Sequence, residues 1–408
     1  MSTEYRVLTP DDVEQSAHVE AVAFYNEPGP ARVEMAKKYL PPEWTVGAFV
    51  DGKLVADVRT VPMVRRINGG TMAFGAVGPV ACLSAYRRQG HVARLLRFAI
   101  ETMRERSQVM SGLHTPHDAL YARYGWERAE GRVRYQFYPK DVHLRHRGVS
   151  GRIDQVTKDD WHRLDRIYQA HTAKRNGPFA RNAVWWQLAV LAHFESPGDW
   201  KDNEIFVWSN PDGSDEGYVV YSDRPLPQDT DWPRRVVQVR DFVAITGDAY
   251  LGLWQHMLTH DLAEHIIAYM PPDDPFPNQV HDPFRVQVSP GYGAMLRIVD
   301  VEQAIALRPY AGDRPVSFTM RILDHAAPWN EATWRIETAD GGRMQAERTD
   351  GEPDVELTAN ALAPIFTAFM TPEVAAGAGL LRVFRAEAVE EMTEAFRVLY
   401  PPYCHDSY

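Results

Sequence analysis

The chain has 408 residues, more than a single hydrophobic core ordinarily serves, so two or three domains are expected. It is 45% hydrophobic and 24% charged, and no apolar run approaches the roughly 18 residues that a membrane span needs, so no membrane partner is expected. The formal net charge of −11 argues against general nucleic-acid binding and would attract a cationic small substrate, although such charge also serves solubility.

The beginning of the sequence and its cysteines indicate a compartment. The first ten residues have neither the basic nor the apolar segment of an export signal. Two cysteines, Cys82 and Cys404, give no disulfide framework and suit a reducing environment. A cytoplasmic protein is therefore expected.

Two stretches of the chain share one pattern. Thr9 is the expected N-cap of the first helix, and Asp12 lies in its first turn, where the helix dipole favours an anion. Thr157 and Asp160 repeat this signature about one domain's length later. Further along each copy, a strand leads through a turn into an amphipathic helix, at residues 72–103 and 235–258. We infer a duplicated α/β unit.

The last part of the chain has a different rhythm. Five prolines within residues 271–283 mark a loop or boundary. From about residue 286, short alternating apolar runs predict an antiparallel sheet, and residues 358–370 and 386–400 predict helices packed against it. The expected domains are residues 1–148, 149–285 and 286–408.

The turn between residues 84 and 91 places positive charge where a helix begins. The first backbone N–H groups of a helix have no intrahelical partner, and together with the helix dipole they form an anion site. Gly90 allows close backbone approach, and Arg87 and Arg88 add charge, so a pyrophosphate is the natural ligand. The second copy has Gly247 and Asp248 at this place and no basic residue. The alternative is a pair of merely solvated arginines.

This turn resembles the acetyl-coenzyme A loop of the GNAT acyltransferases. Arg87, Gly90 and Val92 occupy the positions of its R-x-x-G-x-[GA] pattern, although Val92 replaces the family's small residue. The resemblance implies acetyl-coenzyme A as co-substrate, with its pyrophosphate on Arg87, Arg88, Gln89, Gly90, His91, Val92 and Ala93. It also implies that Val80, Ala81 and Cys82, in the strand that enters the loop, offer backbone groups to the pantetheine arm.

A narrower resemblance covers nearly the whole chain. Residues 114–126, HTPHDALYARYGW, are similar to the I-Y-G-R-F-G-Y segment of the Eis (enhanced intracellular survival) family of aminoglycoside and lysine N-acetyltransferases. The C-terminal segments GEPDVELTANALAPIF and PPYCHDSY are also similar to that family. The resemblance implies an α/β (α+β) fold: tandem GNAT-like mixed sheets with flanking helices, then a sterol-carrier-protein-like α/β domain. It further implies a homohexamer.

The same resemblance implies the catalytic residues. Tyr121 falls at the family's general acid, and Pro116 and His117 before it would touch the coenzyme. The α-carboxylate of Tyr408 would enter the active site as a base, through a water relay or as an ammonium anchor, and these roles are not separable from sequence. Composition alone favours the alternatives, in which Tyr121 is an ordinary core tyrosine beside Tyr124 and Trp126 and Tyr408 is a frayed terminus.

A histidine-rich stripe is the other candidate for chemistry in the sequence. His256, His260 and Glu264 recur at helical spacing, but Met257 stands where the glutamate of an H-E-x-x-H zinc site belongs, so no metal is expected. The predicted function is transfer of an acetyl group to an amine of an aminoglycoside, polyamine or lysine side chain. The alternatives are a non-catalytic acyl-coenzyme A and lipid-binding protein, and a protein N-acyltransferase.

Overall fold

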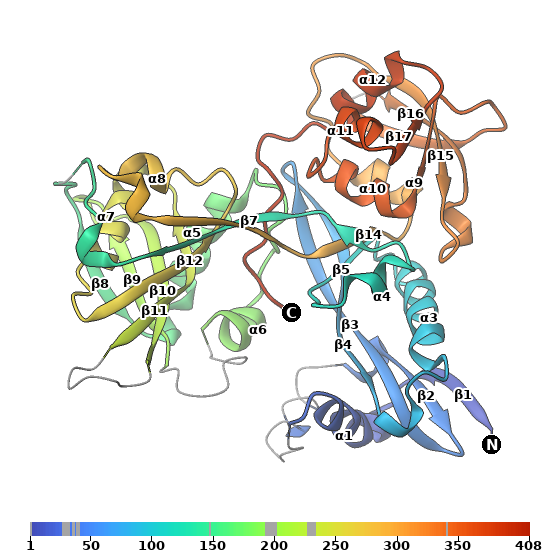
Figure 1. The fold of residues 1–408 in the computed structure, drawn as a ribbon, viewed down its shortest axis with the longest axis horizontal. Helices are drawn as coiled ribbons and strands as arrows, with labels where there is room; N and C mark the ends of the chain where they lie inside the picture. The colour runs from blue at the N-terminus through green and yellow to red at the C-terminus, as the bar shows by residue number, and fades with distance from the viewer. Residues whose placement is uncertain are drawn as a thin grey trace. The chain divides into compact units, whose positions relative to one another are not determined.

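The computed structural model describes residues 2–26, 33–34, 37, 41–146, 148–191, 202–226, 234–339 and 342–408. The chain forms two compact units, and Figure 1 labels most of their helices and strands. The first contains Met1–Ala129, Ala294–Val398 and Tyr408. The second contains Glu130–Gly293 and Leu399–Ser407.

A seven-stranded mixed sheet organises the N-terminal part of the first unit. Its order is β1 (Thr3–Val7), β2 (Thr45–Val50), β3 (Lys53–Ile67), β4 (Gly70–Cys82), β5 (Met110–Leu113), β14 (Met295–Ile298) and β6 (Glu127–Arg128). Its helices are α1 (Val13–Ala23), α3 (His91–Glu105) and α4 (Asp118–Ala122). Phe49 of β2 packs in one cluster with Val19 of α1, whereas its neighbour Ala48 packs in another with Leu95 of α3. Because successive strand residues point to opposite faces, α1 and α3 cover the two faces of this sheet.

The C-terminal part of the first unit has its own five-stranded sheet. Its order is β17 (Arg343–Arg348), β16 (Ala332–Ala339), β15 (Ser317–Leu323), β18 (Val355–Thr358) and β19 (Leu381–Val383), with helices α9 (Val301–Leu307), α10 (Ala359–Phe366), α11 (Pro372–Gly377) and α12 (Glu387–Ala395). The expectation of a purely antiparallel sheet was wrong, because β18 runs parallel to β15. Strands β15, β16 and β17 form a meander, and β18 then pairs with the free edge of β15. The two predicted helices are present as α10 and α12.

The second unit repeats the two-faced arrangement. Its sheet has the order β13 (Gln287–Tyr292), β7 (Gly131–Phe137), β12 (Ala263–Met270), β11 (Arg235–Ala244), β10 (Asp215–Pro225), β9 (Glu204–Ser209) and β8 (Arg152–Val156), with helices α5 (Trp161–Thr172), α6 (Ala183–Trp185), α7 (Gly247–Met257) and α8 (Phe276–Gln279). Val219 of β10 packs with α7, and the adjacent Val220 packs with α5.

The predicted repeat signature is confirmed at both helix starts. Thr9 and Asp12 form a reciprocal capping box around the one-turn helix Pro10–Asp12 that leads into α1. Thr157 and Asp160 form the same box before α5. Such a box satisfies backbone N–H groups that the first turn leaves unpaired.

The strands are not distributed among the sheets in simple chain order. Strand β7 follows β6 directly in the chain but pairs with β12 and β13 in the second unit. Strand β14 follows β13 but pairs with β5 and β6 in the first unit. The chain therefore leaves the first unit at Ala129 and returns to it at Ala294. The three-domain division at residues 148 and 285 stays a prediction of the sequence.

Candidate active site

The basic turn before α3 leaves the helix start open. Gly90 is the N-cap, with φ 87°, and no side chain caps this end of α3. Arg88 also has a left-handed backbone, with φ 62°. In a non-glycine residue this conformation costs on the order of 1 kcal/mol. The first N–H groups of α3 are therefore available to a ligand beside an arginine held in a strained turn.

The equivalent turn of the second unit is closed by its own side chain. Thr246 is the N-cap of α7, and its hydroxyl oxygen accepts a hydrogen bond from the backbone N–H of Ala249 at 3.2 Å. Asp248 lies in the first turn of this helix. The two copies therefore differ in capping as well as in charge. The second copy has a capped helix start and an acidic residue, which do not favour anion binding.

Strand β4 separates from β5 as it approaches the turn. The two strands pair in parallel only through Phe74, Gly75 and Ala76, opposite residues 110–112. Beyond Ala76, β4 continues to Cys82 while still paired with β3. The segment Val80–Cys82 thus has one edge that β5 does not cover. The carbonyl oxygen of Cys82 on this segment accepts a hydrogen bond from Nε of Arg87 at 3.2 Å, which ties the turn to the strand.

A pocket of about 800 Å³ lies between the turn and α4. It is lined by Arg88, Pro116, His117, Asp118, Ala119, Leu120 and Arg123. Three residues that the resemblance assigned to the coenzyme, Arg88, Pro116 and His117, therefore face one space. The carboxylate of Asp118 is paired with Arg128 at 2.6 Å, so the remaining charge of the lining is positive.

Arg123 lines the pocket but was not among the site residues predicted from the sequence. It occupies the arginine position of the I-Y-G-R-F-G-Y pattern and was the only charged residue of the YARYGW stretch, which is the signal that could have found it.

The side chains of the other predicted loop residues contact the protein itself. The side chain of His91 is buried, and its Nδ1 shares a hydrogen bond of 2.9 Å with the hydroxyl of Tyr5. Val92 and Ala93 are partly buried and pack against the core cluster. The Gln89 amide donates to the carbonyl of Ala85 at 3.0 Å. These side chains hold the turn in shape, so a ligand would meet the main chain at positions 89–93.

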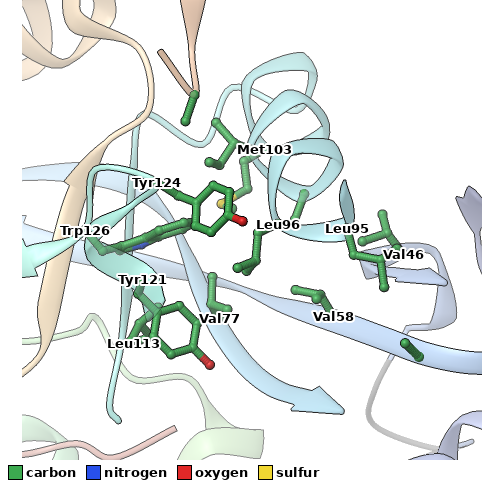
Figure 2. Close-up of a cluster of buried hydrophobic side chains, with 14 of the residues drawn as sticks. Val46, Val58, Val77, Leu95, Leu96, Met103, Leu113, Tyr121, Tyr124 and Trp126 are labelled. Atoms are coloured by element: carbon green, nitrogen blue, oxygen red, sulfur yellow. The ribbon is translucent and has the colours of Figure 1, made fainter. Parts of the chain in front are cut away.

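Tyr121 is an aromatic-cluster residue of helix α4. It is 9% exposed, and its ring meets the ring of Trp126 edge-on at a centroid distance of 6.3 Å. Figure 2 shows it beside Leu113 and Val77, with its hydroxyl directed away from Trp126. Burial raises the pKa of this hydroxyl, which keeps it protonated near neutral pH, the state a proton donor needs.

Tyr408 lies where β4 and β5 part. Its ring meets Phe74 of β4 edge-on at 6.1 Å and the ring of His114 at 5.0 Å. A Cβ placed on Gly112 of β5 would come within 2.7 Å of the Tyr408 hydroxyl oxygen, and one placed on Gly78 of β4 within 3.6 Å of a terminal carboxyl oxygen. The last residue is thus seated against the sheet of the first unit and is not frayed.

The histidine stripe of the second unit does not join the glutamate suggested by its spacing. Glu264 forms an ion pair with Arg234. The rings of His256 and His260 lie 5.6 Å apart, and burial lowers the pKa of His256 to about 4. Among the described residues, no group of three His, Cys, Asp or Glu side chains is arranged to hold a metal.

Comparison with known protein families defines the class of protein. Residues 4–129 match a model of an acetyltransferase (GNAT) domain, residues 177–298 match a second GNAT model, and residues 301–405 match a sterol carrier protein domain. With the open helix start and the parted strands of the first unit, these matches define a GNAT N-acetyltransferase, a class that uses acetyl-coenzyme A.

The chain is Eis-like in its domain arrangement, with two GNAT domains followed by a C-terminal sterol carrier protein domain. It is 24% identical to the N-acetyltransferase Eis of Mycobacterium tuberculosis, over 84% of this chain and 82% of the relative. It is also 24% identical to an uncharacterized N-acetyltransferase of Streptomyces avermitilis, over 98% and 99% of the two chains.

Solved structures share its architecture. Eis1 from Mycobacterium abscessus superposes with a TM-score of 0.81 and 25% identity, covering 99% of this chain and 100% of that one. A GCN5-related N-acetyltransferase from Anabaena variabilis has a TM-score of 0.86 and 18% identity, with complete coverage of both chains. The predicted α/β fold with tandem GNAT units and a sterol-carrier-like domain is confirmed. Within the described residues, no helix is both long and apolar enough to cross a membrane.

Proposed function

We propose that the protein transfers the acetyl group of acetyl-coenzyme A to a primary amine of a cationic acceptor. The observation that carries this proposal is the pocket that joins Arg88 of the basic turn to His117 and to α4, the helix that bears Tyr121. The groups proposed to bind the pyrophosphate and the tyrosine proposed as the acid thus lie on adjoining elements of one unit.

The residues present fit the coenzyme. The open N–H groups at residues 90–93, with Arg87 and Arg88, would hold the pyrophosphate. The main chain of Val80, Ala81 and Cys82, on the edge that β5 leaves uncovered, would meet the amide groups of the pantetheine arm. Pro116 and His117 would close the opposite side of the pocket.

Two groups of the chain would move protons. The amine nitrogen forms a bond to the acetyl carbon, and the bond from that carbon to sulfur breaks. Tyr121 gives its proton to the departing sulfur and recovers one from solvent. The proton lost by the amine goes to the Tyr408 carboxylate, directly or through water, and this carboxylate also attracts the ammonium form of the acceptor. The seating of Tyr408 between β4 and β5 supports this role.

The acceptor classes we propose are aminoglycosides, polyamines and lysine side chains. The formal net charge of −11 supports a cationic acceptor. A cytoplasmic location is also proposed, because the two cysteines give no disulfide framework. A homohexameric assembly is proposed on the resemblance to Eis proteins alone.

The test is release of coenzyme A thiol from acetyl-coenzyme A over a panel of these amines. We expect amine-dependent release by the intact protein and a loss of about 100-fold in turnover in Tyr121→Phe and in a chain lacking only Tyr408. Tyr138→Phe, at a more exposed tyrosine of the second unit, is the matched control and should keep full activity.

Two other outcomes would favour the alternatives. Tight acetyl-coenzyme A binding without release on any amine would indicate a non-catalytic acyl-coenzyme A-binding protein. Release with protein acceptors alone would indicate a protein N-acyltransferase.

A further inference from the structure

The helix that carries Tyr121 is too short to hold its own position. Helix α4 spans only Asp118–Ala122, and an isolated helix of this length is not stable in water. The chain then turns through Gly125 to the buried Trp126. The position of the Tyr121 hydroxyl therefore depends on what fixes the backbone at residues 122–126.

Asn360 of the C-terminal domain binds this backbone at two points. Its side-chain nitrogen Nδ2 donates to the carbonyl oxygen of Ala122 at 2.9 Å and to that of Trp126 at 3.3 Å. An asparagine amide has two N–H groups, so both bonds form together. Asn360 itself is fixed in the first turn of α10, whose start is capped by the hydroxyl of Thr358.

Arg297 holds the carbonyl between these two. Its Nη1 donates to the carbonyl oxygen of Tyr124, and its Nη2 binds both carboxylate oxygens of Asp324 at 2.7 and 2.9 Å. Arg297 is fully buried, so this bond is protected from water. The backbone carbonyl oxygens of every second residue, at 122, 124 and 126, thus accept hydrogen bonds from side chains outside the segment.

Gly125 is what allows the close approach. Its φ is +83°, and an added Cβ would lie 2.3 Å from Nη1 of Arg297 and 3.0 Å from the Cβ of Ala359 at the start of α10. A side chain here would push the segment away from its holders.

We propose that Asn360 is a positioning residue for Tyr121, and that the C-terminal domain serves the acetyl transfer by fixing the acid. This inference rests on the proposed function. Asn360 acts through the backbone that follows the tyrosine. An error of about 1 Å in the position of a reacting group can cost about 100-fold in rate, so loss of the hydrogen bonds is expected to lower turnover.

The test uses the full chain with Asn360→Ala and Asn360→Asp. Asn360→Asp keeps the shape of the side chain and removes both N–H donors, so it remains informative if Asn360→Ala folds poorly. We expect both to lower kcat about tenfold and to leave the KM for acetyl-coenzyme A within about twofold. The control is Asn278→Ala, at an exposed asparagine of the second unit, which should change neither constant.

A double-mutant cycle separates positioning from a general structural effect. In a Tyr121→Phe background, Asn360→Ala should lower the residual rate less than twofold, because its effect passes through the missing hydroxyl. An equal tenfold loss in both backgrounds would overturn the proposal, as would unchanged kcat in both single variants of an active protein. If the intact protein releases no thiol on any amine, the proposed function fails and this inference falls with it.

Discussion

Gly90 combines a left-handed backbone with a place at the open start of α3. Its φ is +87°, and nothing lies within 4 Å of where a Cβ would be. An alanine here would meet no protein atom. It would strain the turn and place a methyl group where the coenzyme pyrophosphate is expected.

Gly90→Ala should therefore weaken acetyl-coenzyme A binding about tenfold, and the strain should lower the melting temperature no more than it does in Gly213→Ala. Titration calorimetry measures the affinity. Gly213→Ala is a close control, because Gly213 has φ +85° and equally open surroundings in the second unit. Equal weakening in both variants would contradict the assignment of the turn.

Asp57 is a second residue with a measurable consequence. It is fully buried, and its Oδ2 accepts a hydrogen bond from Ser16 at 2.6 Å. Burial first, and then the charge of Glu20, raise the pKa of its carboxyl from 3.8 to about 8. The folded state thus holds a proton that the unfolded state releases at lower pH.

Because the folded pKa is the higher one, this contribution to stability is complete below pH 3.8 and is lost as the pH rises towards 8. Asp57→Asn should remove this loss. The free energy of unfolding of the variant, relative to that of the wild type, should therefore increase as the pH rises from 5 to 8. Urea unfolding at several pH values measures the difference. A parallel pair of pH profiles would show that Asp57 is ionised in the fold; Asp212→Asn, at an exposed site, serves as reference.

Site residues that belong to a short sequence motif could be predicted from the sequence. Arg88, Pro116 and His117 were predicted from the basic turn and from the lead-in to Tyr121, and they line one pocket. Asn360 was not predicted, because it binds Ala122 across 238 positions of sequence and such a contact leaves no local pattern.

Among the elements, the C-terminal tail is held within the second unit by a buried ion-pair network. Arg181 donates from Nε to Asp406 at 3.0 Å and from Nη1 to Asp241 at 2.5 Å. The indole nitrogen of Trp185 also donates to Asp406, at 2.9 Å. All three charged side chains are almost wholly buried.

Asp406→Ala should release the tail, because it leaves Arg181 with one carboxylate and removes a hydrogen bond from Trp185. Carboxypeptidase should then remove the residues that follow Pro402 at least about tenfold faster than from the wild type. Ser407→Ala, at an exposed neighbour, should be digested at the wild-type rate. Identical digestion of both variants would show that the network does not hold the tail.

Element types were predictable from periodicity, but neighbours were not. The N-cap threonines Thr9 and Thr157 and the helices after each turn were predicted from the sequence. The insertion of β14 between β5 and β6, and the parallel pairing of β18 with β15, were not. Alternation of apolar residues shows which face of a strand is buried, but it does not say which strand lies beside it.

In the whole molecule, the two GNAT units are expected to differ in their ability to bind acetyl-coenzyme A. The first GNAT unit has an open, basic helix start at α3, whereas α7 of the second is capped by Thr246 and carries Asp248. We expect one acetyl-coenzyme A bound per chain, measured by titration calorimetry on the intact protein. Gly90→Ala should weaken that single event without uncovering another. A stoichiometry of two would show that the second unit also binds the coenzyme.

The position of β14 also constrains how the protein can be made. Its residues, Met295–Ile298, hydrogen-bond to β5 on one side and to β6 on the other. During synthesis, β5 and β6 therefore lack their hydrogen-bonding partner β14 until Ile298 has left the ribosome. A truncated gene product ending near residue 148 would keep those edges exposed and would be prone to aggregate. The sheet of the first GNAT domain is thus completed by a strand that the chain supplies about 160 residues after the end of that domain's match at residue 129.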